Sequence, residues 1–266
     1  MSKVVRSLTS GAESLARSAI LLARGAILAL IFSIGACGAE SEGDMASAAD
    51  VEITAFVGSG VQIEWDGTVI HVDPRGDYTN AKPADLILIT DTPVDHLDPD
   101  LIQQLRKAGA PVVLPSTPDD ARDAGSRERL LRVPDGLVMD NGDVMTLAGV
   151  LVEAVPMYDI LPGNPFHAKG EGNGYVITLG GKRIYLSGVT ECTPEMRALQ
   201  DIDIAFVPMN LPNGRMVPLV AADCVKMIRP AVVYPYHYRE LPIDEFVEAL
   251  RDEPDIEVRV YDWYPS

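Results

Sequence analysis

The hydrophobic pattern of residues 51–72 predicts a β-meander at the start of the folded part of the chain. Apolar and polar positions alternate in three short runs, as they do in strands that bury one face. These runs predict strands at residues 52–57, 61–65 and 68–72. Asp66-Gly67 favours a tight hairpin turn between the second and third strands, and Asp73-Pro74 ends the third.

The stretch from residue 85 to residue 98 changes abruptly from apolar to polar. Residues 86–89 are four consecutive apolar side chains, which is typical of a strand buried on both faces of a layered α/β protein. A polar loop follows, and Asp98-Pro99 then has the residues preferred at a helix N-cap and at the first helical position. We therefore expect Asp95 and His96 to lie between a rigid strand and a rigid helix, where α/β folds commonly place their chemistry.

The rest of the chain predicts alternating strands and helices. The predicted helices are residues 101–108, 117–129, 217–227 and 243–250. The predicted strands are residues 111–114, 138–146, 150–156, 175–179, 183–186, 202–207, 231–235 and 257–261. The runs 138–146 and 150–156, with Asn141-Gly142 in the first, predict a second meander, and a long polar loop follows residue 157. Two groups of strands, each with helices, predict an α/β fold of the αββα sandwich type.

The first 36 residues differ from the rest and resemble a secretory signal. A basic start is followed by the apolar run 25–36 and then by Cys37, preceded by small residues as in a bacterial lipobox. The apolar run is shorter than the roughly 20 residues of a membrane span. We predict a lipoprotein signal peptide at residues 1–36, a tether at 37–50 and one domain at 51–266, with an uncleaved anchor as the alternative. The predicted location is the bacterial cell envelope, with a lipid on Cys37 as the contact with the membrane.

Net charge argues against one class of function, and the cysteine content raises the question of a disulfide. The formal net charge is −17, and a chain this acidic does not suit nucleic-acid binding. Apart from Cys37, the chain contains only Cys192 and Cys224. An exported location permits a disulfide, but nothing in the sequence places these two residues together, so we predict free buried thiols.

Residues 90–98, T-D-T-P-V-D-H-L-D, resemble the T-H-x-H-x-D-H-L-D signature of the metallo-β-lactamase superfamily. The opening meander, closed by I-x-V-D-P at residues 70–74, is also similar to that superfamily, and in particular to its ascorbate-6-phosphate lactonase branch. Many members of that branch carry Gly-His at the first turn, where this chain has Ser59. The resemblance covers residues 51–261 and implies the αββα sandwich, with a two-metal site at one edge.

The resemblance also implies which residues would bind metal. Asp95, His96 and His237 match the ligands of the second metal. The ligands of the first metal are mostly replaced: Asp91 and Pro93 stand where two histidines would be, and either His167 or Asp159 takes the place of the third. The bridging aspartate is absent, because Gly188-Val189-Thr190 replaces Gly-Asp-Thr.

Two functions follow from this ligand set. The first hypothesis is a degenerate member that keeps the fold and acts as a non-hydrolytic binding or scaffold protein for a small-molecule or protein ligand. The second is a hydrolase of an ester, lactone or phosphodiester with one zinc ion held by Asp95, His96 and His237, and with Asp91, His167 or Asp159 as candidate extra ligands. The cofactor is therefore either one zinc or none. A purely structural role also remains open, since a histidine near a strand end such as His71 is often only hydrogen-bonded.

Overall fold

The computed structural model describes residues 50–117, 123–160, 165–209 and 216–264. The predicted signal peptide, Cys37 and residues 37–49 of the predicted tether lie outside these ranges. Within the described ranges, no helix is both long enough and apolar enough to cross a membrane.

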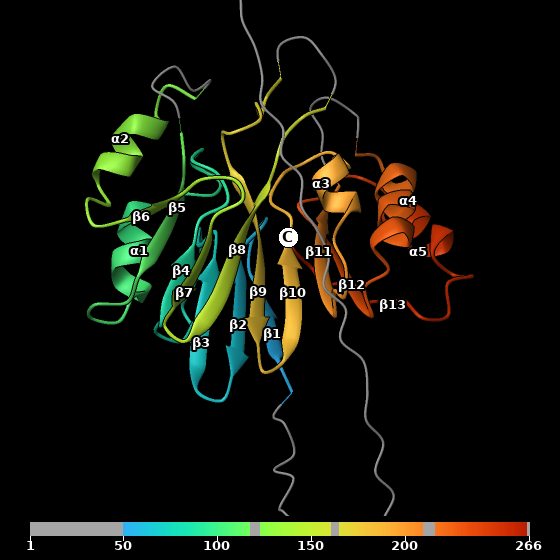
Figure 1. The fold of residues 1–266 in the computed structure, drawn as a ribbon, viewed down its shortest axis with the longest axis horizontal. Coiled ribbons are helices and arrows are strands. Elements are labelled where there is room, and N and C mark those ends of the chain that lie inside the picture. The colour runs from blue at the N-terminus through green and yellow to red at the C-terminus, as the bar shows by residue number, and fades with distance from the viewer. Residues whose placement is uncertain (1–49, 118–122, 161–164, 210–215, 265–266) are drawn as a thin grey trace, which may run out of the picture. The chain divides into compact units, whose positions relative to one another are not determined.

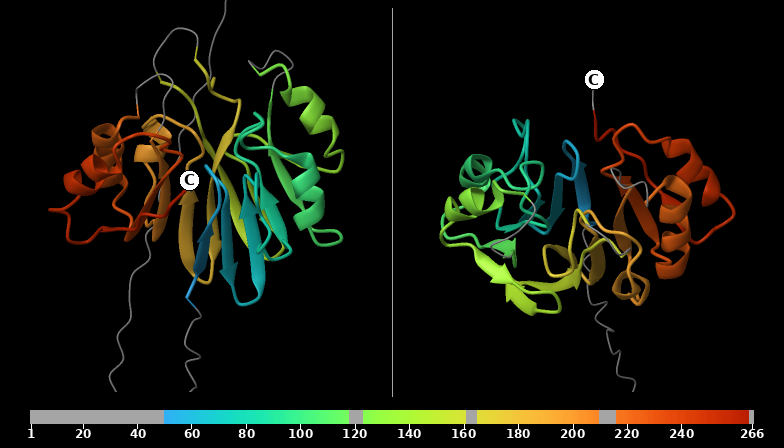
Figure 2. Two further views of the ribbon diagram at one scale, coloured as in Figure 1. Left: turned by 180° about the vertical axis from the view of Figure 1, so that it is seen from behind. Right: turned by 90° about the horizontal axis from the view of Figure 1, so that it is seen from above.

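Two β-sheets pack face to face and helices cover their outer surfaces (Figures 1 and 2). The first sheet has the order β1 (Glu52–Ala55), β2 (Val61–Trp65), β3 (Thr68–Val72), β4 (Leu86–Leu88), β5 (Val112–Pro115) and β6 (Leu137–Met139). The second has the order β13 (Glu257–Val258), β12 (Val232–Tyr236), β11 (Ile204–Pro208), β10 (Lys182–Leu186), β9 (Asn173–Leu179), β8 (Val150–Pro156) and β7 (Val144–Leu147).

The helices complete the four layers. Two of them, α1 (Pro99–Leu105) and α2 (Ser126–Leu131), lie beside the first sheet. Three others, α3 (Pro194–Arg197), α4 (Pro218–Ile228) and α5 (Ile243–Ala249), lie beside the second. The fold is therefore the αββα sandwich that the sequence predicts.

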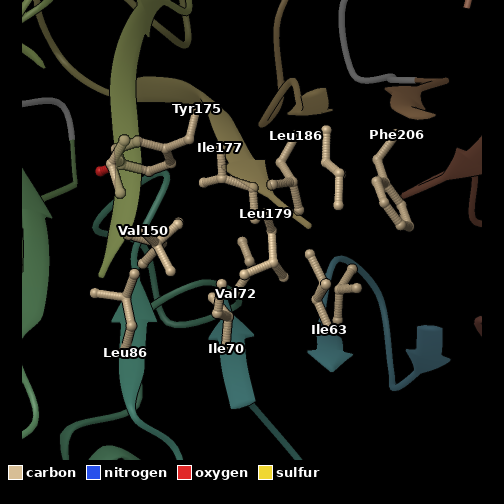
Figure 3. Packing of buried hydrophobic residues seen from close by; sticks show 14 of the residues in the cluster. Ile63, Ile70, Val72, Leu86, Val150, Tyr175, Ile177, Leu179, Leu186 and Phe206 are labelled. Carbon is tan, nitrogen blue, oxygen red and sulfur yellow. The ribbon is translucent and has the colours of Figure 1, made fainter. Parts of the chain in front are cut away.

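The fully apolar run at β4 has a simple explanation in this architecture. Leu86 and Leu88 point into the core between the two sheets, while Ile87 and Ile89 pack against α1 and its neighbours. Figure 3 shows Leu86 and residues of the second sheet such as Val150 meeting in the central core. Successive side chains of a strand point to opposite faces. The core covers one face of β4 and helices cover the other, so every position of the strand is buried and apolar.

Parallel pairing brings several loops to the same edge of each sheet. In the first sheet β3, β4, β5 and β6 run parallel, and in the second β10, β11, β12 and β13 run parallel. The loops after β3, β4, β10 and β12 follow the carboxyl ends of these strands, which is the edge where α/β proteins bind ligands.

Two sequence predictions about secondary structure are wrong. The run 138–146 is not one strand of a meander, because β6 pairs with β5 in the first sheet and β7 pairs with β8 in the second. The Asn141-Gly142 turn instead connects the sheets, and the Asn141 amide donates to the Gly172 carbonyl at 2.8 Å. The predicted helix at 117–129 begins only at Ser126 and ends at Leu131; residues 118–122 lie outside the described ranges.

The prediction of two free thiols is contradicted as well, because Cys192 and Cys224 form a disulfide. Their Cα atoms lie 5.8 Å apart, well within the usual range for a bridge. Cys192 precedes α3 and Cys224 lies on α4, and these two helices pack on the same face of the second sheet. The proximity arises from packing across a separation of 32 residues, which local sequence does not reveal.

We expect Cys192 and Cys224 to resist thiol labelling in denaturant until a reductant is added. Reduction should also lower the free energy of unfolding by roughly 3–4 kcal/mol, the loop-closure entropy expected for a loop of this length. Mass spectrometry after alkylation, with and without reductant, measures the first effect, and denaturant titration measures the second. Labelling of both thiols without reductant would restore the original prediction.

Candidate metal centre

The loop between β4 and α1 holds two candidate ligands in a fixed position. Asp98 caps α1 as predicted, since its Oδ1 accepts from the backbone N–H groups of Asp100 and Leu101, each at 3.1 Å. The His96 N–H donates to the Pro93 carbonyl at 2.9 Å and closes a turn just before the helix. Such local bonds satisfy the helix N-terminus and restrict the loop, so Asp95 and His96 are presented by a rigid scaffold.

His237 reaches the same place from the second sheet. It directly follows β12, and its N–H donates to the Gly58 carbonyl at 3.2 Å, which ties this loop to the first turn of the chain. Its φ is +50°, a left-handed conformation that a non-glycine residue adopts only when its surroundings enforce it.

Asp95, His96 and His237 converge, as the sequence predicts. One ligand atom from each lies within 4.8 Å of the others, and within the described ranges no other group of three or more His, Cys, Asp or Glu residues does this. The imidazoles of His96 and His237 are nearly parallel, with ring centroids 5.5 Å apart. His237 Nε2 lies 3.8 Å from Asp95 Oδ2. Two imidazole nitrogens and a carboxylate oxygen form a usual donor set for a divalent metal.

Asp73 is the residue of this site that the sequence analysis missed. It is fully buried at the end of β3, and its Oδ2 lies 2.8 Å from His96 Nδ1. A carboxylate can only accept, so Nδ1 carries a proton and Nε2 is the nitrogen left to bind a ligand. Carboxylates commonly orient metal-binding histidines in this way. The I-x-V-D-P pattern marked the strand end, but the contact with His96 depends on the pairing of β3 with β4.

Ser59 contributes a smaller contact to the same histidine. Its buried hydroxyl lies 3.2 Å from His96 Nδ1. The residue that stands in place of a relative's histidine therefore lies against the candidate site, where it can hydrogen-bond but is a poor metal ligand.

The charges of the site favour a cation at its centre. Burial opposes protonation of His96, but Asp73 and then Asp95 and Asp91 overcome this and raise its pKa to about 9. Interaction with His237 holds the pKa of Asp95 well below its ordinary value. Burial lowers the pKa of His237, so this imidazole is neutral at physiological pH. Three carboxylates thus surround two imidazoles, and protonated His96 carries the one positive charge among them. A metal ion could take the place of the His96 proton and supply positive charge there instead.

The three converging side chains suit a single metal ion with an open coordination position. His237 Nδ1 is buried and no atom of the described part of the chain pairs with it. His71 Nδ1, outside the site, shares this property, so an unpaired ring nitrogen is compatible with a ligand but does not by itself mark one. Three protein donors with a fourth position open is the arrangement of catalytic rather than structural zinc sites.

The other candidate ligands form a separate cluster next to this one. His167 Nε2 lies 3.6 Å from Asp91 Oδ2, and His167 Nδ1 lies 3.3 Å from Asp159 Oδ1. The sequence treats His167 and Asp159 as alternatives for one position, whereas the structure pairs them with each other. Burial raises the pKa of Asp91, a carboxyl that is only 7% exposed.

A bridged pair of metals does not fit these residues. Val189, in place of the bridging aspartate, is buried and offers no ligand atom; its N–H lies 3.1 Å from Met157 Sδ. Pro93 likewise has no side-chain atom that could bind a metal. The candidate residues open on two clefts: one of about 250 Å³ beside Asp91 and His167, and one of about 450 Å³ beside Asp95 and His237.

Proteins similar to this chain are named as metal-dependent hydrolases, in agreement with a metal centre. A metal-dependent hydrolase of the UPF0173 group from Thermococcus onnurineus is 28% identical over 198 residues, which cover 66% of this chain and 80% of that protein. One from Pyrobaculum arsenaticum is 30% identical over 191 residues, covering 69% and 76%.

Solved structures extend the similarity to three dimensions. A protein from Parabacteroides distasonis that has been assigned as a metal-dependent hydrolase has a TM-score of 0.70 and 37% identity, covering 80% of this chain and 94% of that one. The metallo hydrolase Igni18 from Ignicoccus hospitalis has a TM-score of 0.61 and 25% identity, covering 79% and 94%. None of these relatives singles out the ascorbate-6-phosphate lactonase branch, so that finer placement stays a prediction.

The family assignment rests on a match to a family model. A family model described as the beta-lactamase superfamily domain matches residues 52–237, from β1 to the candidate ligand after β12. That span is well over half of the chain and includes Asp95, His96 and His237. This protein therefore belongs to the metallo-β-lactamase superfamily.

Proposed function

We propose that this protein is a hydrolase that uses a single divalent metal, zinc being the best match to the ligands, held by Asp95, His96 and His237. The observation that carries the proposal is the convergence of these three donors on one point, with His96 oriented by the buried Asp73. The relatives named as metal-dependent hydrolases support it. They lend no support to a non-hydrolytic scaffold, so we place the hydrolase first and keep the scaffold as the alternative.

Each residue has a defined task in this proposal. When bound, the metal would polarise the substrate and make a coordinated water acidic enough to act as a nucleophile near neutral pH. Asp73 keeps the proton on His96 Nδ1, so that Nε2 faces the centre. His237 is kept neutral by burial and can offer a nitrogen lone pair. Asp91 and His167 line the smaller cleft rather than the larger one and are candidate extra ligands.

The substrate belongs to the ester, lactone or phosphodiester class in this proposal, by analogy with the superfamily. Elemental analysis of the purified protein, followed by a panel of these three substrate types, tests the proposal. About one metal per chain together with metal-dependent turnover supports it. No metal after incubation with zinc, and no turnover, would favour the scaffold alternative. Two metals per chain would mean that the matching of ligands is wrong.

A second metal position should be recoverable by mutation. We expect the triple change Asp91→His, Pro93→His and Val189→Asp to raise zinc content from about one to about two per chain, because it restores the missing donors. Val189→Asp alone is the matched control: it places an unpaired carboxylate at a buried position, which should cost on the order of 3 kcal/mol of stability. Zinc should recover that loss only in the triple variant. Unchanged zinc content in a folded triple variant would contradict the assignment of these positions.

We also propose that the protein is exported and anchored by a lipid on Cys37. The lipobox-like sequence motivates this, and the Cys192–Cys224 disulfide supports it, because such bonds persist mainly in oxidising compartments. Cys37→Ser is expected to prevent lipidation and to leave an unprocessed precursor or release the protein from the membrane fraction. Metabolic labelling with a fatty-acid analogue measures this. Labelling that persists in the variant would refute the assignment of Cys37.

A further inference from the structure

The larger cleft beside the candidate metal centre combines ligands with arginines. Its volume is about 450 Å³, and Asp95 and His237 form part of its lining. Two loops of the site also bring guanidinium groups: Arg75 lies two residues after Asp73, which orients His96, and Arg239 lies two residues after the candidate ligand His237.

Arg75 is positioned by the same strand end that orients His96. Asp73 is fixed by bonds from Thr90 and His96, and Pro74 restricts the backbone between it and Arg75. Arg75 is half-buried, and no carboxylate of the described residues lies within ion-pair distance of it. A half-buried guanidinium without a carboxylate partner has spare donors for an anion.

Arg239 reaches the cleft from the loop after β12. Its Nη2 lies 3.4 Å from Asp95 Oδ2, so one of its donors faces a candidate ligand. Its backbone φ is +50°, as is that of His237, and both residues of this short loop line the cleft. The side chain is 60% exposed, which leaves its other donors accessible from the cleft.

The cleft also differs in charge from the rest of the molecule. The whole chain carries −17, yet the charged residues lining this cleft are Arg75 and Arg239 against Asp95 and Glu240. These four charges cancel, and a divalent cation at the candidate centre would make the cleft positive. With a cation bound next to two guanidinium groups, this cleft would attract anions although the protein as a whole is acidic.

We propose that Arg75 and Arg239 bind an oxyanion group of the substrate, a carboxylate or a phosphate, so that the hydrolase acts on anionic small molecules. Guanidinium groups recognise both oxyanions with paired N–H donors. Tyr264 forms part of the same cleft and adds an aromatic wall and a hydroxyl beside the two arginines. The substrate assignment rests on the proposed function, whereas binding of the anion does not.

Binding is tested first on the full chain as purified, with its metal content measured in the same preparation. Isothermal titration calorimetry with inorganic phosphate and with acetate should show saturable binding of at least one. Arg75→Gln and Arg239→Gln should each weaken it about tenfold, the effect of losing one charge-assisted contact. Arg251→Gln is the matched control: it removes an exposed arginine that pairs with Glu248 and does not line this cleft, so the variant should bind as the unmodified protein does.

Two more variants separate charge from geometry and from misfolding. Arg75→Lys keeps the charge but loses the planar fork, so its affinity should lie between those of the unmodified protein and Arg75→Gln. Glu240→Gln removes a negative charge from the cleft and should bind the anion more tightly, a gain that a damaged fold would not give. Stronger binding of phosphate or of acetate identifies which oxyanion is preferred.

Kinetics extend the test to the substrate. Turnover of mono-4-nitrophenyl succinate, which carries a carboxylate, should suffer a KM increase of about tenfold in Arg75→Gln, whereas uncharged 4-nitrophenyl acetate should be unaffected. No hydrolysis of either compound would count against the proposed function but leave the binding result standing. Phosphate and acetate affinities that are undetectable, or unchanged by Arg75→Gln and Arg239→Gln, would overturn the anion site even if the protein is a metal-dependent hydrolase.

Discussion

Replacing His96 or His237 with alanine is expected to remove the metal from the protein and to lower turnover about a thousandfold or more. Among the described residues, three side chains converge here, and loss of one leaves two, too few for a tight zinc site. A metal contributes several kcal/mol of transition-state stabilisation, and about 1.4 kcal/mol corresponds to a tenfold change in rate. Elemental analysis and steady-state kinetics on the same preparations measure both effects.

Two further variants make this experiment specific. His237 has a left-handed backbone, so alanine at this position adds strain; His237→Asn is the better folded test, because asparagine tolerates that conformation. His71→Gln is the matched control. His71 is also a buried histidine at the end of β3, but its Nε2 bonds to the Lys82 carbonyl at 2.8 Å and it is absent from the candidate centre. Metal retained in His96→Ala and His237→Asn would refute the site.

The parts of the fold that depend on neighbouring residues could be predicted from the sequence. The apolar run at β4, the Asp98 cap and Pro99 act within a few residues of one another, and the structure has all three as expected. The hairpin of β2 and β3 likewise follows from Asp66-Gly67. These signals are local because hydrogen bonds of turns and helix ends are local.

The features that depend on packing could not be predicted in the same way. Residues 138–146 divide between two sheets because β6 finds its partner in β5, a choice that the hydrophobic pattern does not encode. The Cys192–Cys224 disulfide depends on α3 and α4 sharing one face of a sheet.

The candidate site shows the same division. The resemblance to a known signature indicated Asp95, His96 and His237, and the structure brings them together. The role of Asp73 was missed because it depends on a contact with a residue 23 positions away. His167 and Asp159 were treated as alternatives because nothing in the sequence shows that they lie 3.3 Å apart.

Asp73→Asn is expected to weaken metal binding about 10- to 100-fold although Asp73 is not a ligand, the range found when partners of ligands are lost. The Asp73 carboxylate accepts three hydrogen bonds: from Thr90 N at 2.7 Å, from Thr90 Oγ1 at 2.6 Å and from His96 Nδ1 at 2.8 Å. Asparagine has only one acceptor oxygen. If that oxygen keeps the Thr90 N–H, the amide nitrogen faces His96 Nδ1 and donates to it. The imidazole proton then moves to Nε2, which can no longer bind a metal.

Thr90→Val is the control for the loss of a buried hydrogen bond. It removes the Oγ1 donor to Asp73 and a longer 3.3 Å contact with His96 Nδ1, but it leaves the carboxylate facing His96, so it should cost about 1 kcal/mol of stability with metal affinity nearly unchanged. A metal-competition titration with a chromophoric chelator compares the three proteins. Equal loss of affinity in Thr90→Val and Asp73→Asn would mean that Asp73 acts only through packing.

The pH dependence of stability distinguishes the two variants without any metal. In the metal-free protein, the carboxylates around His96 raise its pKa from 6.5 to about 9. A raised histidine pKa stabilises the folded state fully below pH 6.5, and the contribution disappears as pH rises to 9. The free energy of unfolding should therefore fall by on the order of 3 kcal/mol across this interval. His237, whose pKa is lowered, adds no loss there, because its contribution to stability changes only below pH 6.5.

Asp73→Asn removes the strongest partner of the His96 charge, so the unfolding free energy of this variant should be nearly constant from pH 6.5 to 9. Thr90→Val should keep the decline. Parallel slopes in all three proteins would show that Asp73 does not set the charge of His96.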